Sequence, residues 1–218
     1  MKNSLFICGL IVLNLAVVAQ ATEIGGDWTV NTLIPQGNPV GITESETFTG
    51  LNLGSISGVD VQLNISGGYN GGLYGYLEYQ AAAGGTATEV LLNQVGTSPS
   101  NPLGSSGAGF NVTLSDSGTV NGDIHGATGI PTGVWQPDSP VSLDSTFGGM
   151  SADGTWTLFI ADLDSGGGTS ELNSWGLEAS VPDDMRTGLV LGISGFLILV
   201  VEKWIRSKRK MSPLLQSI

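Results

Sequence analysis

The chain has 218 residues, of which 19 are Asp or Glu and 7 are Lys or Arg, for a formal net charge of −12. The basic residues lie only near the two ends, whereas residues 22–185 hold every acid except Glu202 and contain no Lys or Arg. A segment this acidic repels phosphate backbones, which excludes nucleic acid as a partner. The only cysteine, Cys8, lies in an N-terminal segment that is expected to be cleaved, so we expect no disulfide in the mature protein, and with a single histidine we expect no zinc site.

The first 21 residues have the pattern of a secretory signal peptide. Lys2 supplies a short positive region, residues 5–18 are mainly apolar, and Ala19-Gln20-Ala21 is a small-x-small cleavage site. We expect cleavage after Ala21, and a retained N-terminal anchor is the alternative. The body of the protein is therefore expected to be exported.

Residues 22–180 are expected to form one domain, large enough to bury a substantial core. Short alternating runs separated by turn residues predict strands, and no segment shows helical periodicity over three turns. The clearest strand is 59–65, with its apolar side chains on one face. Further strands are expected at 73–80, 88–95, 109–114, 154–161 and 170–179, with a loop at 98–107. The pattern predicts an all-β fold, a single antiparallel β-sandwich.

The last two of these strands carry the strongest apolar signal of the domain. We interpret them as a hairpin whose core positions are Trp156, Leu158, Leu172, Trp175 and Leu177. The spacing from Leu172 to Trp175 breaks strict alternation, which predicts a β-bulge near Asn173-Ser174.

These strands resemble the closing motif of the P domain, also called the P/Homo B domain. The resemblance rests on the run Gly154–Leu158, on Asp162 and the glycine-rich loop, and on Leu172, Trp175 and Leu177. Residues 59–79 resemble earlier strands of the same domain. The resemblance implies a jelly-roll β-sandwich, which in proprotein convertases and bacterial subtilisin-like proteases follows the catalytic domain and does not itself catalyse. No protease domain is seen in this sequence, and residues 147–153 lack the His-Trp-Gly-Glu of the convertases.

The loop after residue 161 is the best candidate for a metal site. Asp162, Asp164 and Glu171 offer carboxylate oxygens, which Ca²⁺ prefers, and the start of the loop resembles a calcium-binding loop. The spacing differs from that of an EF-hand. A plain acidic turn is the alternative, so Ca²⁺ is a candidate rather than a required cofactor.

Catalytic chemistry is not expected in this domain. Short matches to the Asp, His and Ser motifs of subtilisin-like proteases occur around Asp116, His125 and Ser170, but their spacing does not suit the large α/β sheet that such a triad needs. The many acids offer pairs for glycoside hydrolysis, and no spacing selects one of them. We therefore expect a protein that is not an enzyme.

The C-terminal end combines an apolar run with a basic cluster. Residues 188–205 are long enough for a short transmembrane helix, and the cluster that follows predicts a cytoplasmic end, with residues 211–218 as a tail. The basic residues of this cluster are Arg206, Lys208, Arg209 and Lys210. A plain single-span anchor is one interpretation.

The segment 181–210 also resembles the PEP-CTERM and VPDSG-CTERM sorting signals of Gram-negative bacteria, through Val181-Pro182-Asp183, the short apolar helix and the basic cluster. The resemblance implies an inner-membrane precursor, an exosortase as partner, cleavage near Val181-Pro182-Asp183, and transfer to the cell surface or extracellular matrix.

The sequence thus predicts an exported, non-catalytic surface or matrix module that acts in structure or interaction, with exopolysaccharide or other matrix proteins as partners. One alternative is an accessory P domain that works with a separate subtilisin-like serine protease. A second is a carbohydrate-binding module whose stacking platforms are Trp135, Tyr69, Tyr74 or Tyr76.

Overall fold

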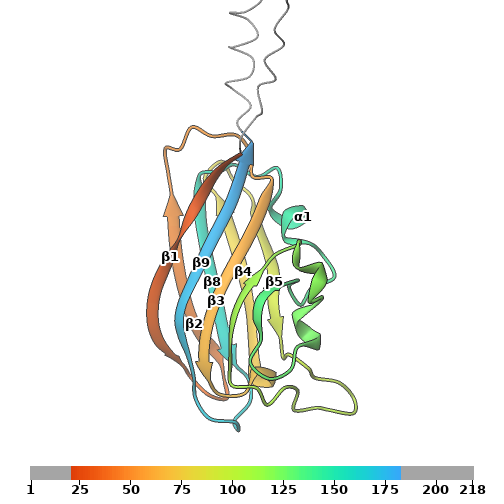
Figure 1. Ribbon diagram of the computed structural model, residues 1–218. Helices are drawn as coiled ribbons and strands as arrows, with labels where there is room; N and C mark the ends of the chain where they lie inside the picture. Colours follow the sequence, from red (N-terminus) through yellow and green to blue (C-terminus); the bar gives the residue numbers. More distant parts are fainter. Residues whose placement is uncertain (1–20, 183–218) are drawn as a thin grey trace, which may run out of the picture. The chain divides into compact units, whose positions relative to one another are not determined.

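Residues 21–182, the part of the chain that the computed structural model describes, form two β-sheets packed face to face (Figure 1). Sheet A has five strands in the spatial order β1 (Ala21–Ile34), β9 (Ser170–Pro182), β3 (Gly58–Gly67), β6 (Gly109–Leu114) and β7 (Thr132–Trp135). Sheet B has four strands in the order β2 (Asn38–Phe48), β8 (Gly154–Asp162), β4 (Leu73–Ala81) and β5 (Thr86–Asn93).

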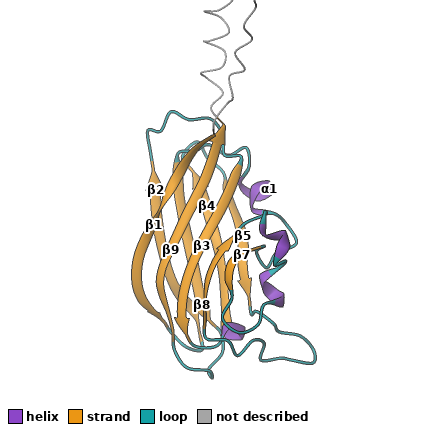
Figure 2. Ribbon diagram, in the orientation of Figure 1, coloured by secondary structure: helices purple, strands orange, loops and turns teal. Residues whose placement is uncertain are grey.

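Within residues 21–182 the helical content is small (Figure 2). It consists of α1 (Leu143–Phe147) and of the 3₁₀ turns η1 (Asn70–Gly72), η2 (Gly118–Val120) and η3 (Ile124–Gly126). The predicted all-β, two-sheet fold is thus confirmed for this part of the chain. The expected signal peptide, the membrane helix at 188–205 and the basic cluster lie outside the described residues. Within residues 21–182, no helix has the length and apolar character needed to cross a membrane.

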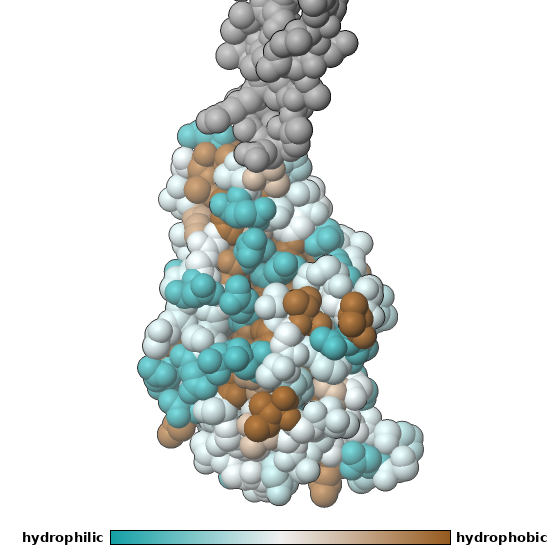
Figure 3. All heavy atoms as spheres, viewed as in Figure 1, coloured by the Kyte–Doolittle hydropathy of each residue, from teal (hydrophilic) through white to brown (hydrophobic). Residues whose placement is uncertain are grey.

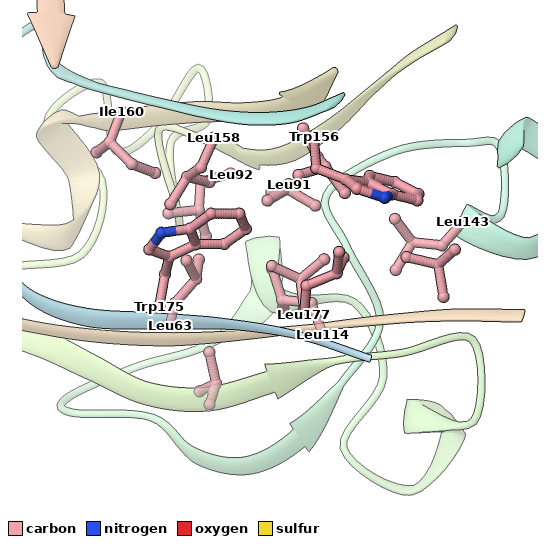
Figure 4. Close-up of a cluster of buried hydrophobic side chains, with 14 of the residues drawn as sticks. Leu63, Leu91, Leu92, Leu114, Leu143, Trp156, Leu158, Ile160, Trp175 and Leu177 are labelled. Carbon is pink, nitrogen blue, oxygen red and sulfur yellow. The ribbon is translucent and has the colours of Figure 1, made fainter. Parts of the chain in front are cut away.

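The core forms where the inward faces of the two sheets meet. The alternation read from residues 59–65 is confirmed, because Val59, Val61, Leu63 and Ile65 of β3 are all buried. Trp156 of β8 and Trp175 of β9 are also buried, and they enter the core from opposite sheets (Figure 4). Trp156 stacks on Tyr79 with 4.1 Å between ring centroids, and Trp175 packs 4.8 Å from Trp28. The other core positions expected near these tryptophans, Leu158, Leu172 and Leu177, are buried as well.

The predicted hairpin of the last two strands is wrong. β8 lies in sheet B and β9 in sheet A, so the loop 163–169 crosses from one sheet to the other. The physical reason is that both strands have one buried face, and two such faces bury each other when the strands lie in opposite layers. The predicted bulge is confirmed, because Asn64 pairs with Ser174 and Ile65 with Leu172, which leaves Asn173 as the extra residue.

Two long strands, β1 and β2, were not expected from the sequence. In β2, Glu44 and Glu46 stand opposite the buried Leu158 and Trp156, so glutamates occupy the inward face of this strand. β2 is an edge strand, and inward charges on an edge strand hinder pairing with another chain. Such a strand lacks the apolar alternation by which strands are recognised.

One strand pair departs from the expected antiparallel arrangement. β7 runs parallel to β6, and Asn111 to Leu114 pair with Thr132 to Trp135. The segment 115–131 carries η2 and η3 and returns the chain to the same end of the sheet, as a parallel pair requires.

Replacement of Trp156 by alanine should lower the free energy of unfolding by about 3–5 kcal/mol, because it leaves a cavity beside Tyr79 in the core. Urea denaturation of the full chain, followed by tryptophan fluorescence, measures this loss. The matched control is Trp135→Ala. The ring of Trp135 is only partly buried at the edge strand β7, so its loss should lower the free energy of unfolding by less. Equal losses for the two variants would contradict the packing described here.

Candidate functional site

Asp162 is a buried carboxylate at one end of the sandwich. As the last residue of β8 it shares the inward face of Trp156, Leu158 and Ile160, and its side chain is 1% exposed. Its Oδ1 accepts a hydrogen bond from the backbone N–H of Asp164 at 3.1 Å, while Oδ2 is buried without a partner. Burial raises the pKa of this carboxyl, the Asp164 hydrogen bond lowers it, and the Asp164 charge raises it further.

Hydrogen bonds hold the loop 163–169, which follows Asp162, in place. Asp164 Oδ1 accepts from the backbone N–H of Gly166 at 3.0 Å, and the Gln36 side chain donates to the Gly166 carbonyl at 2.6 Å. The backbone N–H of Leu163 donates to the Gly72 carbonyl at 2.7 Å. These bonds fix the loop against the β1–β2 turn and against η1.

The structure does not bring the three predicted calcium ligands, Asp162, Asp164 and Glu171, together. Glu171 alternates with Ser170 and Leu172, which are buried, so Glu171 lies on the outer face of sheet A while Asp162 points inward. Within residues 21–182, no three His, Cys, Asp or Glu side chains come together as a metal site. The calcium site as predicted from sequence stays a prediction.

Ser170, which was not expected to be a ligand, is buried at the same end of the sandwich as Asp162. It is the first residue of β9, it is 0% exposed, and its Oγ is buried without a partner. The signal was available in the sequence, because Ser170 lies two residues before the core residue Leu172 and thus on the same face of the strand.

His125 is held between two acceptors. Its Nδ1 lies 2.7 Å from Asp138 Oδ2, and its Nε2 lies 2.9 Å from the Thr97 carbonyl. A carbonyl can only accept, so both ring nitrogens donate when Asp138 is ionised, and the ring is then a cation. The hydrogen bond to Asp138 raises the pKa of His125, burial lowers it, and the Thr97 carbonyl and the charges of Asp138 and Asp123 raise it further, for a net increase. Burial also raises the pKa of the Asp138 carboxyl, against the lowering effect of His125.

The fragments of a protease triad are not assembled. The Asp116 carboxylate accepts the backbone N–H groups of Leu143 and Asp144 at 3.0 and 2.9 Å, which caps the start of α1. His125 is paired with Asp138 instead, and Ser170 is buried. These three side chains therefore serve separate local structures.

The outer face of sheet B carries a cluster of three aromatic rings. Tyr74 and Tyr76 lie two residues apart on β4, and Phe159 lies opposite Tyr76 on β8. Phe159 stacks on Tyr76 with 4.7 Å between ring centroids, and Tyr74 lies 6.3 Å from Tyr76 and 6.5 Å from Phe159. All three are partly exposed, and their neighbours on β4 are buried.

Hydroxyl groups continue this face beyond the rings. Ser45 and Thr157 are joined by a hydroxyl–hydroxyl hydrogen bond of 2.9 Å, and Thr47 and Thr155 by another of 2.9 Å. Of the other aromatics considered from sequence, Tyr69 is 41% exposed on the β3–η1 connection, and Trp135 donates its Nε1–H to the Thr132 carbonyl.

The outer face of sheet A is polar instead of aromatic. A shallow groove crosses it where Gly176 has no side chain, and Asp27, Gln62, Asn64 and Asn111 line it. Figure 3 shows hydrophilic side chains over much of this face, with a few separate apolar ones between them. The groove offers hydrogen bonds and no platform for stacking.

The predicted processing motif begins inside the fold. Val181 is buried and pairs with Thr22, and Pro182 pairs with Ala21 at the end of β9. Ala19, Asp183 and the basic cluster at 206–210 lie outside the described residues.

The His125 pair predicts that stability falls as the pH rises. Because the pKa of His125 is raised in the folded state, its contribution is fully present below the unfolded pKa of about 6.5 and is lost as the pH rises through the folded pKa. Thermal melts of the full chain at constant ionic strength, from about pH 5.5 to about pH 9, measure this fall. His125→Gln should remove it, and an unchanged slope in that variant would contradict the assignment.

Comparison with known proteins adds a limited similarity in structure. No protein-family model matches the chain, and no curated protein matches it. Among solved structures, the serine protease of Aeromonas sobria in complex with its chaperone ORF2 is similar over 78% of this chain and 28% of the matched chain, at 16% identity and a TM-score of 0.45. The structure of the Aeromonas sobria serine protease by itself is similar over 77% of this chain and 28% of that one, at 15% identity and a TM-score of 0.42. The present chain therefore spans about 28% of the length of each matched chain.

Proposed function

We propose that this protein is an exported, non-catalytic surface or matrix module with a P-domain-like sandwich, and that it binds neutral polysaccharide on the outer face of sheet B. The observation that carries the proposal is the aromatic cluster of Tyr74, Tyr76 and Phe159. Its rings lie outside the core, on a face where the neighbouring outward side chains are mostly hydroxylic.

Partly exposed rings on the outer face of a sheet suit the apolar face of a pyranose ring. Tyrosine presents a large apolar surface together with a polar hydroxyl, which is useful where a ligand is apolar on one side and hydroxylated on the other. The hydroxyls of Ser45, Thr155 and Thr157, with the carboxylate of Glu78 opposite Thr157, supply nearby hydrogen-bonding groups. A polysaccharide chain can therefore stack on the rings and form hydrogen bonds along the same face.

The charge of the domain favours a neutral polysaccharide over an anionic one. Residues 21–182 contain no Lys or Arg that could pair with a uronate or sulfate group. The many carboxylates repel anionic chains at long range, and salt weakens this repulsion.

The geometry of the titratable groups supports a non-catalytic role. His125, the single histidine, has both ring nitrogens engaged by Asp138 and Thr97. A general base needs a nitrogen within reach of a substrate proton. Export and surface sorting are proposed from the two ends of the sequence, residues 1–21 and 181–210.

Replacement of Tyr76 by alanine should weaken polysaccharide binding by about tenfold, equal to ~1.4 kcal/mol, because it removes the ring on which Phe159 stacks. Affinity electrophoresis of the full chain in nonionic detergent, in native gels that contain laminarin or hydroxyethyl cellulose, measures the binding. Alginate, an anionic chain, should not retard the protein.

The matched control is Tyr69→Ala, which removes an exposed tyrosine that lies on the β3–η1 connection and is not one of the three stacked rings. It should bind as the unmodified protein does. Absence of retardation by any neutral polysaccharide, together with copurification of a serine protease, would overturn the proposal in favour of an accessory role.

Deletion of residues 181–210 should redirect the protein, because this segment holds the expected sorting signal and membrane helix. Cell fractionation and surface labelling should find the full-length protein at the cell surface or in the matrix, and the truncated protein elsewhere. Substitution of Arg206, Lys208, Arg209 and Lys210 by glutamine tests the basic cluster without removal of Val181 from its buried position in β9. Unchanged localisation of both variants would contradict the sorting proposal.

A further inference from the structure

Two buried polar atoms without partners stand at the same end of the sandwich. They are Asp162 Oδ2 and Ser170 Oγ, on side chains that are 1% and 0% exposed. Buried polar atoms in native proteins nearly always have a partner, which is another protein group, a water molecule or an ion. A single bound species in contact with both atoms would supply the missing partner of each.

The fold places these two residues at the same end of the sandwich, on opposite sheets. Asp162 ends β8 in sheet B, Ser170 begins β9 in sheet A, and the loop 163–169 joins them across the end of the core. Both residues occupy inward positions of their strands.

A single short segment covers both side chains. A Cβ on Gly68 would clash with Ser170 Oγ, and a Cβ on Gly72 would clash with Asp162 Oδ1 and lie 3.0 Å from the Asp164 Cβ. Gly68 also has a φ of +60°, which disfavours any other residue there. The connection 68–72 is thus closely fitted over Asp162, Asp164 and Ser170.

We propose that this end of the sandwich binds Ca²⁺ through the carboxylates of Asp162 and Asp164 and the hydroxyl of Ser170. All three donors are oxygens, which hard cations prefer, and Ca²⁺ accepts irregular sets of carboxylate, hydroxyl, carbonyl and water oxygens more readily than Mg²⁺ does. The two carboxylates balance the charge of a divalent ion. This ligand set differs from the one expected from sequence, because Ser170 takes the place of Glu171.

The site is expected to be of low affinity. Only two carboxylates contribute, and calcium sites of extracellular modules commonly have dissociation constants of ~10⁻⁴ to 10⁻³ M. The proposed ligands lie in the loop 163–169 and on inward strand positions, whereas the aromatic cluster lies on the outer face of sheet B, so the inference does not rest on the proposed polysaccharide binding.

Calcium titration of the full chain tests the site. The protein, purified in nonionic detergent and stripped with EDTA, is titrated with Ca²⁺ and separately with Mg²⁺ at fixed ionic strength, and its melting temperature is recorded. Terbium luminescence provides a direct binding signal, because the ring of Tyr69 packs against Gly167 in the same loop and can sensitise the ion. We expect a saturable rise in melting temperature that is selective for Ca²⁺.

Variants locate the ion. Asp164→Asn, in a partly exposed position, should raise the dissociation constant at least tenfold, and Asp162→Asn should abolish the response. If Asp162→Asn does not fold, Asp164→Asn and Ser170→Ala still test the site. Glu178→Gln, an exposed acid on β9, is the matched control for a lost charge and should respond as the unmodified protein does.

Two results would overturn the proposal. The first is a weak rise in melting temperature that is equal for Ca²⁺ and Mg²⁺ and that Glu178→Gln changes as much as Asp164→Asn does. Such a result would show that the ions only screen the negative charge. The second is no response in the unmodified protein, which would assign the two buried atoms to a water molecule or to a protonated Asp162.

Discussion

The described domain must hold many carboxylates without any lysine or arginine. It contains 16 of the chain's 19 acids, because only Asp183, Asp184 and Glu202 lie beyond it, and its one basic side chain is His125. Backbone amides take the place of the absent cations: seven of its nine aspartates accept at least one main-chain N–H, namely Asp116, Asp123, Asp138, Asp144, Asp153, Asp162 and Asp164. Hydrogen bonds from N–H groups stabilise an ionised carboxylate, so the acids also fix the shapes of the loops that carry them.

The absence of lysine and arginine affects both the buried Asp162 carboxylate and the aromatic cluster on sheet B. Asp153 and Asp116 are partly exposed to solvent, whereas Asp162 points into the core and receives one amide on one oxygen only. Its second oxygen therefore requires something from outside the chain or a proton. The aromatic cluster follows from the same composition, since a strongly acidic surface offers stacking and hydroxyl contacts where basic groups would otherwise bind a ligand.

The sequence predicted the inward and outward faces of most strands better than it predicted their partners. The alternation of apolar and polar residues at 59–65 and 154–161 identifies the buried side chains. The same alternation arises in whichever of the two sheets a strand lies, so it does not identify the neighbouring strand. The hairpin was therefore assigned wrongly, although the bulge at Asn173 was located. β2 was missed because Glu44 and Glu46 occupy its inward face. Ser170 and the Asp138 partner of His125 were missed for a different reason: each acquires its role only when segments distant in sequence meet.

The position of β9 has a consequence for the order in which the domain can form. β9 is the last described strand, yet it lies between β1 and β3 and pairs with both along most of its length. The first strand of the domain thus has no neighbour in its sheet until residues 170–182 have been synthesised, and the contacts that close sheet A span almost the whole domain. Contacts this distant in sequence make folding slow. A chain that crosses a membrane from its N-terminus would remain unfolded throughout the passage and fold only on the far side, when its last strand arrives.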